Sequence, residues 1–69
     1  MKNPSIALVK AVISKASKAM TNVEGFALAK AITTTKTNMM RFAMLVPHMG
    51  PEDASDLLRE HGFIEGPPA

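Results

Sequence analysis

The side chains that most often carry chemistry are few in this chain, and their spacing does not build a reactive site. The 69 residues contain no cysteine and only two histidines, His48 and His61, which fall in different predicted segments. Metal sites need several such ligands at short spacing, and neither histidine has them. The acidic residues after Pro51 lack the glycine-bearing loop of a calcium site. The sequence therefore predicts no catalytic residue, no metal and no cofactor, and a protein that is not an enzyme.

Charge is divided along the chain. Seven basic residues and one acidic residue precede Gly50, whereas one basic and five acidic residues follow it. A basic face of one subunit could therefore meet an acidic face of a neighbour. The alternative is a nucleic-acid-binding regulator whose lysines contact phosphates, although aromatic residues for base stacking are scarce. The candidate basic face consists of Lys10, Lys15 and Lys18. The candidate acidic face consists of Glu52, Asp56 and Glu60.

Methionine is frequent, with six residues in 69. Its flexible side chain adapts to irregular partners and recurs at binding surfaces. Met40 and Met44 are four residues apart, on one face of a helix, and are candidates for an exposed apolar patch. The alternative is that methionine fills the core. The residues expected at a protein interface are Met40, Phe42, Met44 and Val46.

No apolar stretch approaches the roughly 20 residues that a membrane-spanning helix needs. Lys10 interrupts the apolar segment near the start, so a signal peptide is not predicted either. The expected location is the cytoplasm or the interior of an assembled particle. A membrane-surface role for residues 4–20 is disfavoured, because this segment lacks Trp and Phe and its apolar half is needed for a core.

The elements that must position these residues are predicted to be helices. Apolar residues recur with helical spacing over 4–20, and Asn3–Pro4 is a favourable helix start. A second helix begins near Val23, where Thr21 can cap it. This second helix is apolar nearly all round, so we expect it to be enclosed. Gly25 in its first turn permits close approach of a neighbouring helix.

The extent of the second helix is ambiguous at the threonine-rich segment 33–38. Consecutive β-branched residues disfavour a helix there, and Thr37 or Asn38 would then cap a third helix. Against this, a heptad pattern runs through the segment, so packing could keep one helix over 23–46. We expect the continuous or slightly kinked helix, with a break near 33–38 as the alternative. The heptad pattern consists of Leu28, Ile32, Thr35, Met39, Phe42 and Val46.

The C-terminal part contains the strongest boundary signals. Two prolines and a glycine predict a turn over 47–50 and a helix over 51–61. Gly62 is expected to end that helix in a left-handed conformation, with the apolar pair after it folding back. Residues 65–69 form a Pro-rich tail, so a single small domain over 1–64 is predicted.

The fold class that follows is all-α: an antiparallel helical hairpin, 4–20 and 23–46, with a short C-terminal helix packed against it. With 46% hydrophobic residues, the helices carry more apolar surface than so short a chain encloses easily. We therefore predict a small helical protein–protein interaction module that self-associates or docks on a larger protein. Such a module suits an accessory part of an assembly, for example a phage particle, or a small inhibitor or regulator. No small-molecule substrate is expected.

Overall fold

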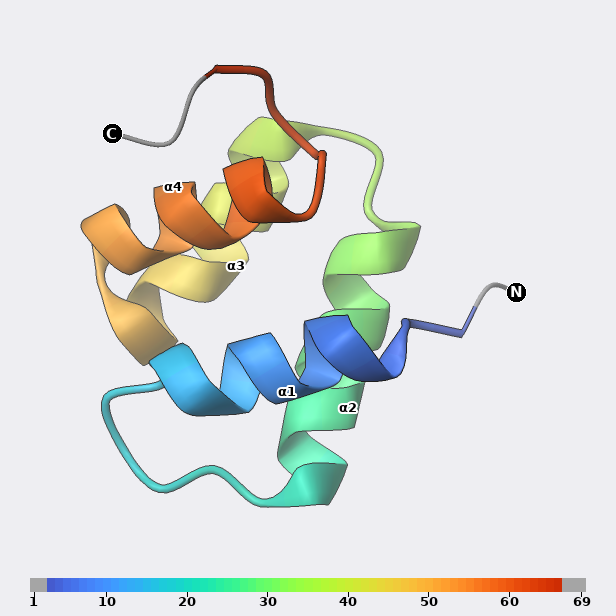
Figure 1. Cartoon of the computed structure of the whole chain (residues 1–69), viewed down its shortest axis with the longest axis vertical. Helices are drawn as coiled ribbons and strands as arrows, with labels where there is room; N and C mark the ends of the chain where they lie inside the picture. The colour runs from blue at the N-terminus through green and yellow to red at the C-terminus, as the bar shows by residue number, and fades with distance from the viewer. Residues whose placement is uncertain (1–2, 67–69) are drawn as a thin grey trace.

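The computed structural model describes residues 3–66, which form four α-helices and no strand. The helices are α1 (Ile6–Lys15), α2 (Asn22–Thr34), α3 (Asn38–Met49) and α4 (Pro51–Glu60). In Figure 1, α1 crosses α2, while α3 and α4 run side by side in opposite directions. The all-α prediction is confirmed. The tail predicted over 65–69 falls largely on residues 67–69, which lie outside the described residues.

The first three helices begin at side chains that accept a backbone hydrogen bond. Ser5 and Thr37 each accept from the N–H three residues ahead, at 3.1 and 3.2 Å. Thr21 and Glu24 form a capping box, in which each side chain accepts from the other residue's N–H, at 3.1 and 3.0 Å. The predicted caps at Thr21 and Thr37 are confirmed, whereas the first helix is capped by Ser5 and not by Asn3.

The first helix ends at Lys15, so the predicted end at Met20 is wrong. Ala16 is extended, with a ψ of 132°. The N–H and the hydroxyl of Ser17 both donate to the carbonyl of His48, at 2.8 and 3.2 Å. This carbonyl lies at the end of α3, where the helix itself provides no donor for it. A contact between distant segments thus replaces the helical bonds that periodicity alone predicted.

The preferred prediction of one helix over 23–46 is also wrong, and the alternative, a break near 33–38, is confirmed. The backbone becomes extended at Thr35, whose hydroxyl donates to the carbonyl of Ala31 at 2.6 Å. Arg41 then donates from Nε to the carbonyl of Ile32 at 2.7 Å, and from Nη2 to the carbonyl of Thr35. The carbonyl of Ala31 already accepts from the N–H of Thr35 at 3.0 Å, so the Thr35 hydroxyl adds a second donor there. Arg41 supplies donors to the carbonyls of Ile32 and Thr35, so the helix can stop there.

The turn predicted over 47–50 is replaced by helix, because α3 continues through Pro47 to Met49. Proline has no N–H, which leaves the carbonyl of Ala43 without its helical donor. Ala43 is exposed, so water can donate to that carbonyl instead. Gly50 then both ends α3 and starts α4, with φ 87° and ψ 165°, a conformation that is open essentially to glycine alone.

The end of α4 has the predicted form. Gly62 is left-handed, with a φ of 78°. The N–H groups of Phe63 and Gly62 donate to the carbonyls of Leu58 and Arg59, at 2.8 and 3.1 Å, as in a Schellman motif. Phe63 therefore folds back against the core, where its carbonyl accepts from Nδ2 of Asn38 at 2.7 Å. The end of the described chain is fixed to the start of α3 in this way.

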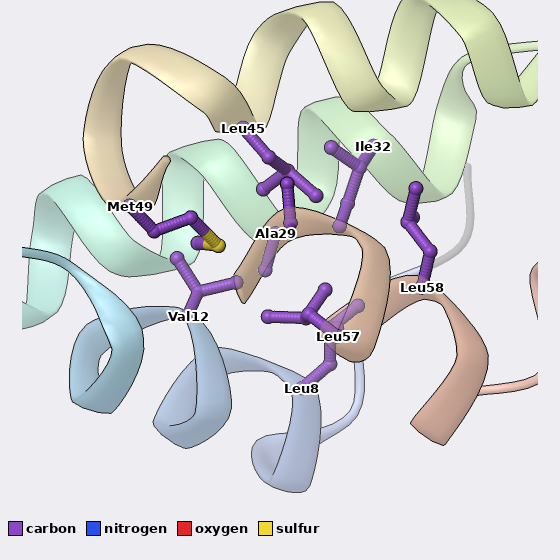
Figure 2. Close-up of a cluster of buried hydrophobic side chains, with 9 residues drawn as sticks. Leu8, Val12, Ala29, Ile32, Leu45, Met49, Leu57 and Leu58 are labelled. Atoms are coloured by element: carbon purple, nitrogen blue, oxygen red, sulfur yellow. The ribbon is translucent and has the colours of Figure 1, made fainter. Parts of the chain in front are cut away.

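One apolar core lies between the helices, and all four contribute to it (Figure 2). No aromatic residue is buried in it. Phe42 and Phe63 pack at its edge, whereas Phe26 is 42% exposed. The buried apolar residues are Leu8, Val12, Ala29, Ile32, Leu45, Met49, Ala54, Leu57 and Leu58.

Candidate interaction surface

The second helix is not enclosed, contrary to the sequence prediction. Its buried side consists of Gly25, Ala29 and Ile32, while Val23 is 79% exposed and Phe26 is 42% exposed. The composition of α2 is apolar all round, but α1 and α3 cover only part of its circumference. An apolar side of α2 is thus left to solvent.

This exposed side of α2 borders a groove that it shares with α1. The groove has a volume of about 310 Å³. Its mouth is apolar, because Ile6 on the α1 wall is 74% exposed, and Lys10 is the one charged residue in the lining. We call it the α1/α2 groove; its lining consists of Pro4, Ile6, Val9, Lys10, Ile13, Asn22 and Phe26.

A glycine sets the close approach of α1 and α2 beside the groove. A Cβ atom at Gly25 would lie 2.4 Å from Cγ1 and 2.7 Å from Cδ1 of Ile13, well inside van der Waals contact. Gly25 is buried, and the lack of a side chain there lets Ile13 pack directly on the α2 backbone. The prediction that Gly25 permits close helix approach is confirmed.

The residues predicted at a protein interface do not share one environment. Met40 is 55% exposed at the start of α3, beside Met39, which is 82% exposed. Phe42, Met44 and Val46 are half-buried and pack against the core. Met39 belongs to the heptad pattern expected to be covered, and it is exposed because the chain breaks helix just before it. The exposed apolar patch on α3 is therefore Met39 with Met40.

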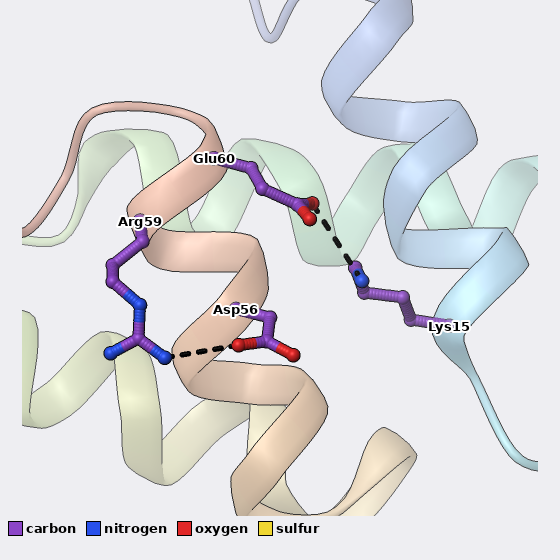
Figure 3. A network of polar contacts seen from close by, with 4 residues as sticks. All are labelled: Lys15, Asp56, Arg59 and Glu60. Carbon is purple, nitrogen blue, oxygen red and sulfur yellow. Dashed lines mark hydrogen bonds and ion pairs between the residues drawn. The ribbon is translucent and has the colours of Figure 1, made fainter. Parts of the chain in front are cut away.

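One residue of the predicted basic face pairs with one of the predicted acidic face within the chain (Figure 3). Lys15 Nζ of α1 lies 3.6 Å from Glu60 Oε1 of α4. Asp56 pairs with Arg59 on its own helix, with 3.0 Å between Oδ1 and Nη2. Each pair is partly exposed, so it contributes at most about 1 kcal/mol to the stability of the fold.

The other members of the two faces are exposed on different elements. Lys10 lies on α1 at the groove, whereas Lys18 lies in the loop that follows α1. The three candidate lysines therefore do not lie on one helix, because α1 ends before the third. Glu52 is exposed in the first turn of α4, where an acidic side chain is favoured by the helix dipole.

A second hollow, of about 500 Å³, lies between the α1–α2 loop and the end of α3. Its lining includes Ser17, Lys18, Glu24 and His48. The hydroxyl of Ser17 donates to the backbone carbonyl of His48 and not to a base, so it is not activated as a nucleophile. The N–H of Thr21, donating to the carboxylate of Glu24, lowers the pKa of that group. These contacts serve helix capping and loop anchoring.

Neither a metal site nor a membrane span is found in the described part of the chain. Among residues 3–66, no group of three or more His, Asp or Glu side chains is placed to hold a metal ion. No helix in that range combines the length and the apolar character needed to cross a membrane. Comparison of the chain with family models, with curated proteins and with solved structures finds no match in any of the three.

The main residues of the α1/α2 groove, Ile6 and Phe26, were not among the site residues predicted from the sequence. Both lie at positions that helical periodicity assigns to an apolar face, and such a face is ordinarily buried. The one available signal was the excess of apolar surface on two short helices. Which part of that surface stays uncovered depends on the crossing of α1 and α2, and this crossing is not encoded in the spacing of apolar residues.

Proposed function

We propose that this chain is a small, non-enzymatic helical interaction module that acts by contact with other protein chains. The observation that supports this function is the uncovered side of α2, where Val23 is exposed and Phe26 lines an apolar groove whose other wall includes Ile6. Scattered exposed apolar residues are ordinary on protein surfaces, but a group of them around a groove is typical of a binding site.

The wider role suited to such a module is that of an accessory part in a larger assembly, such as a phage particle, or of a small inhibitor or regulator. A domain of this size buries only about 60% of the surface that its unfolded chain exposes, so added contacts with a partner stabilise it as well.

Site-specific photocrosslinking in the native cells tests this role. A benzophenone amino acid is placed at Val23, beside the groove, and in a matched chain at Glu52, which is exposed on α4. We expect discrete protein adducts from position 23, containing either a second copy or another protein, and markedly fewer from position 52. The absence of protein adducts from position 23 would contradict the proposal.

The nucleic-acid alternative predicts a different result. Contacts between lysines and phosphates make binding to DNA or RNA fall steeply with added salt. Steep, salt-dependent binding of this chain to generic duplex DNA or to RNA, without protein adducts in cells, would favour that regulator over the interaction module. In the structure, Lys15 is already paired with Glu60, which leaves a smaller basic face than the sequence predicted.

A further inference from the structure

The α1/α2 groove has the shape and lining of a receptor for bulky apolar side chains. Its walls are the apolar residues of two adjacent helices, and a volume of about 310 Å³ accommodates two or three large aliphatic side chains but not a folded element. An amphipathic helix enters such a groove with anchors three or four residues apart. The groove geometry therefore suits the apolar edge of a partner helix.

The charges around the groove are basic. Lys10 belongs to the lining, and Lys30 lies one helical turn beyond Phe26, on the same side of α2. No acidic residue lines the groove, and α1 contains none. The ion pairs found within residues 3–66 involve Lys15 and Arg59, so neither Lys10 nor Lys30 is neutralised there. A partner with acidic residues beside its apolar anchors would complement this surface.

Among residues 3–66, no helix of a second copy offers that combination. The acidic residues of α4 flank apolar side chains that are buried, namely Ala54, Leu57 and Leu58. The exposed Met39 and Met40 lie between two basic residues of the sequence, Lys36 and Arg41.

Glu24 is the one acidic residue next to an exposed apolar residue of α2, Val23. Its carboxylate is held by the N–H of Thr21 at 3.0 Å, and it faces the second hollow and not the groove.

We propose that the α1/α2 groove binds an acidic amphipathic helix of another protein, with its bulky apolar residues in the groove and its carboxylates against Lys10 and Lys30. This inference rests on the interaction role proposed above and specifies the chemistry of the partner. Apolar contact with Ile6 and Phe26 provides affinity, while the two lysines select the sign of the partner's charge.

Fluorescence polarisation with designed helical peptides tests the proposal. The acidic probe carries leucines at i, i+4 and i+7 with glutamates on both flanks. The basic probe replaces every glutamate by lysine, and the third probe replaces the leucines of the acidic one by glutamine. We expect the acidic probe to bind one-to-one, more weakly as salt is added, and about tenfold more tightly than either of the others.

Two variants locate the binding site. Ile6→Asn is expected to weaken the acidic probe about tenfold, because it removes an anchor contact at the mouth of the groove. Met39→Asn is the matched control, since this side chain is as exposed but lies outside the groove, and it should bind like the natural chain. Lys10→Glu should reverse the preference between the acidic and basic probes. Circular dichroism of each variant verifies that the helices are intact.

Three results would overturn the inference. They are equal binding of the acidic and basic probes, equal effects of Ile6→Asn and Met39→Asn, and a dimer in sedimentation velocity that Ile6→Asn dissociates. The last result would assign the groove to a second copy. If adducts from position 23 still form in cells, the interaction role stands and only the acidic-helix assignment fails.

Discussion

Arg41 connects three parts of the chain through one guanidinium group. Its Nε donates to the carbonyl of Ile32 in the last turn of α2, and Nη2 donates to that of Thr35, which follows the helix. Nη1 donates to Asn38 Oδ1 at 2.6 Å on its own helix. The guanidinium carbon also lies 4.8 Å from the centre of the Phe63 ring, a cation–π contact. In the sequence, this arginine only interrupts an apolar stretch. Its role depends on residues 32, 35, 38 and 63, which the fold brings together.

Replacement of Arg41 by alanine should lower the free energy of unfolding by about 2–3 kcal/mol, because partly buried carbonyls lose charged donors. Arg41→Lys should recover only a small part of this loss, since one ammonium group cannot reach acceptors in three directions. Urea denaturation followed by circular dichroism measures both values. If Arg41→Lys were as stable as the natural chain, the positive charge alone would account for the role of this residue.

Glu24 makes stability depend on pH through the capping box of α2. The N–H of Thr21 donates to its carboxylate and holds the folded-state pKa below the ordinary value of 4.5. Because the folded pKa is lower than the unfolded one, the stabilisation is complete above pH 4.5 and is lost as the pH falls through the lowered value. Glu24→Gln, which keeps an acceptor but does not titrate, should lose less stability than the natural chain between neutral pH and about pH 3.

The test for Glu24 is the midpoint of urea denaturation of the natural chain and of the Glu24→Gln variant, each measured at neutral pH and at about pH 3. The other acidic residues are shared by the two chains, so their contributions cancel in the comparison. Parallel losses of stability would show that the capping carboxylate does not contribute to the acid sensitivity.

At the scale of elements, the contact between α1 and α2 is set by a glycine against an isoleucine. Gly25→Ala should destabilise the natural chain by about 1–3 kcal/mol, since the new methyl group overlaps Ile13. In an Ile13→Ala background that overlap is gone, and the same substitution should stabilise the chain by up to about 1 kcal/mol, because alanine favours helix more than glycine does. Thermal denaturation compares the natural chain, the two single variants and the double variant. If Gly25→Ala changed stability in the same direction with Ile13 and with Ala at position 13, this steric explanation would be excluded.

Helix beginnings were predictable in part, and helix ends were less so. The starts of α2 and α4 were predicted, the start of α3 only as the alternative to a continuous helix, and α1 begins after Ser5 and not at Asn3. Thr21, Thr37 and Pro51 act within one turn of the chain, so local chemistry is sufficient to identify them. The ends of α1 and α2 depend on donors and acceptors from distant segments, such as Ser17 with the His48 carbonyl. Of the pair expected in an exposed patch, Met40 is exposed, whereas Met44 packs against the core. The groove formed by two crossing helices also depends on distant contacts and was not predictable.

At the scale of the whole molecule, a small core supports all four helices. Ile32→Ala should cost about 2–5 kcal/mol, because removal of this fully buried side chain leaves a cavity in the core (Figure 2). A domain of this size has a total stability of roughly 3–5 kcal/mol, so the variant should lose most of its cooperative thermal transition. Met39→Ala, at an 82% exposed position, should stay within about 0.5 kcal/mol of the natural chain. Comparable losses in both variants would contradict this core assignment.

The junction at Gly50 has a consequence for how this protein can change over generations. Every single-base missense change of a glycine codon introduces a Cβ atom, and the backbone angles at position 50 admit none without strain. Natural variation is therefore expected to spare this residue, whereas positions 13 and 25 should covary, a small residue at one allowing a larger one at the other.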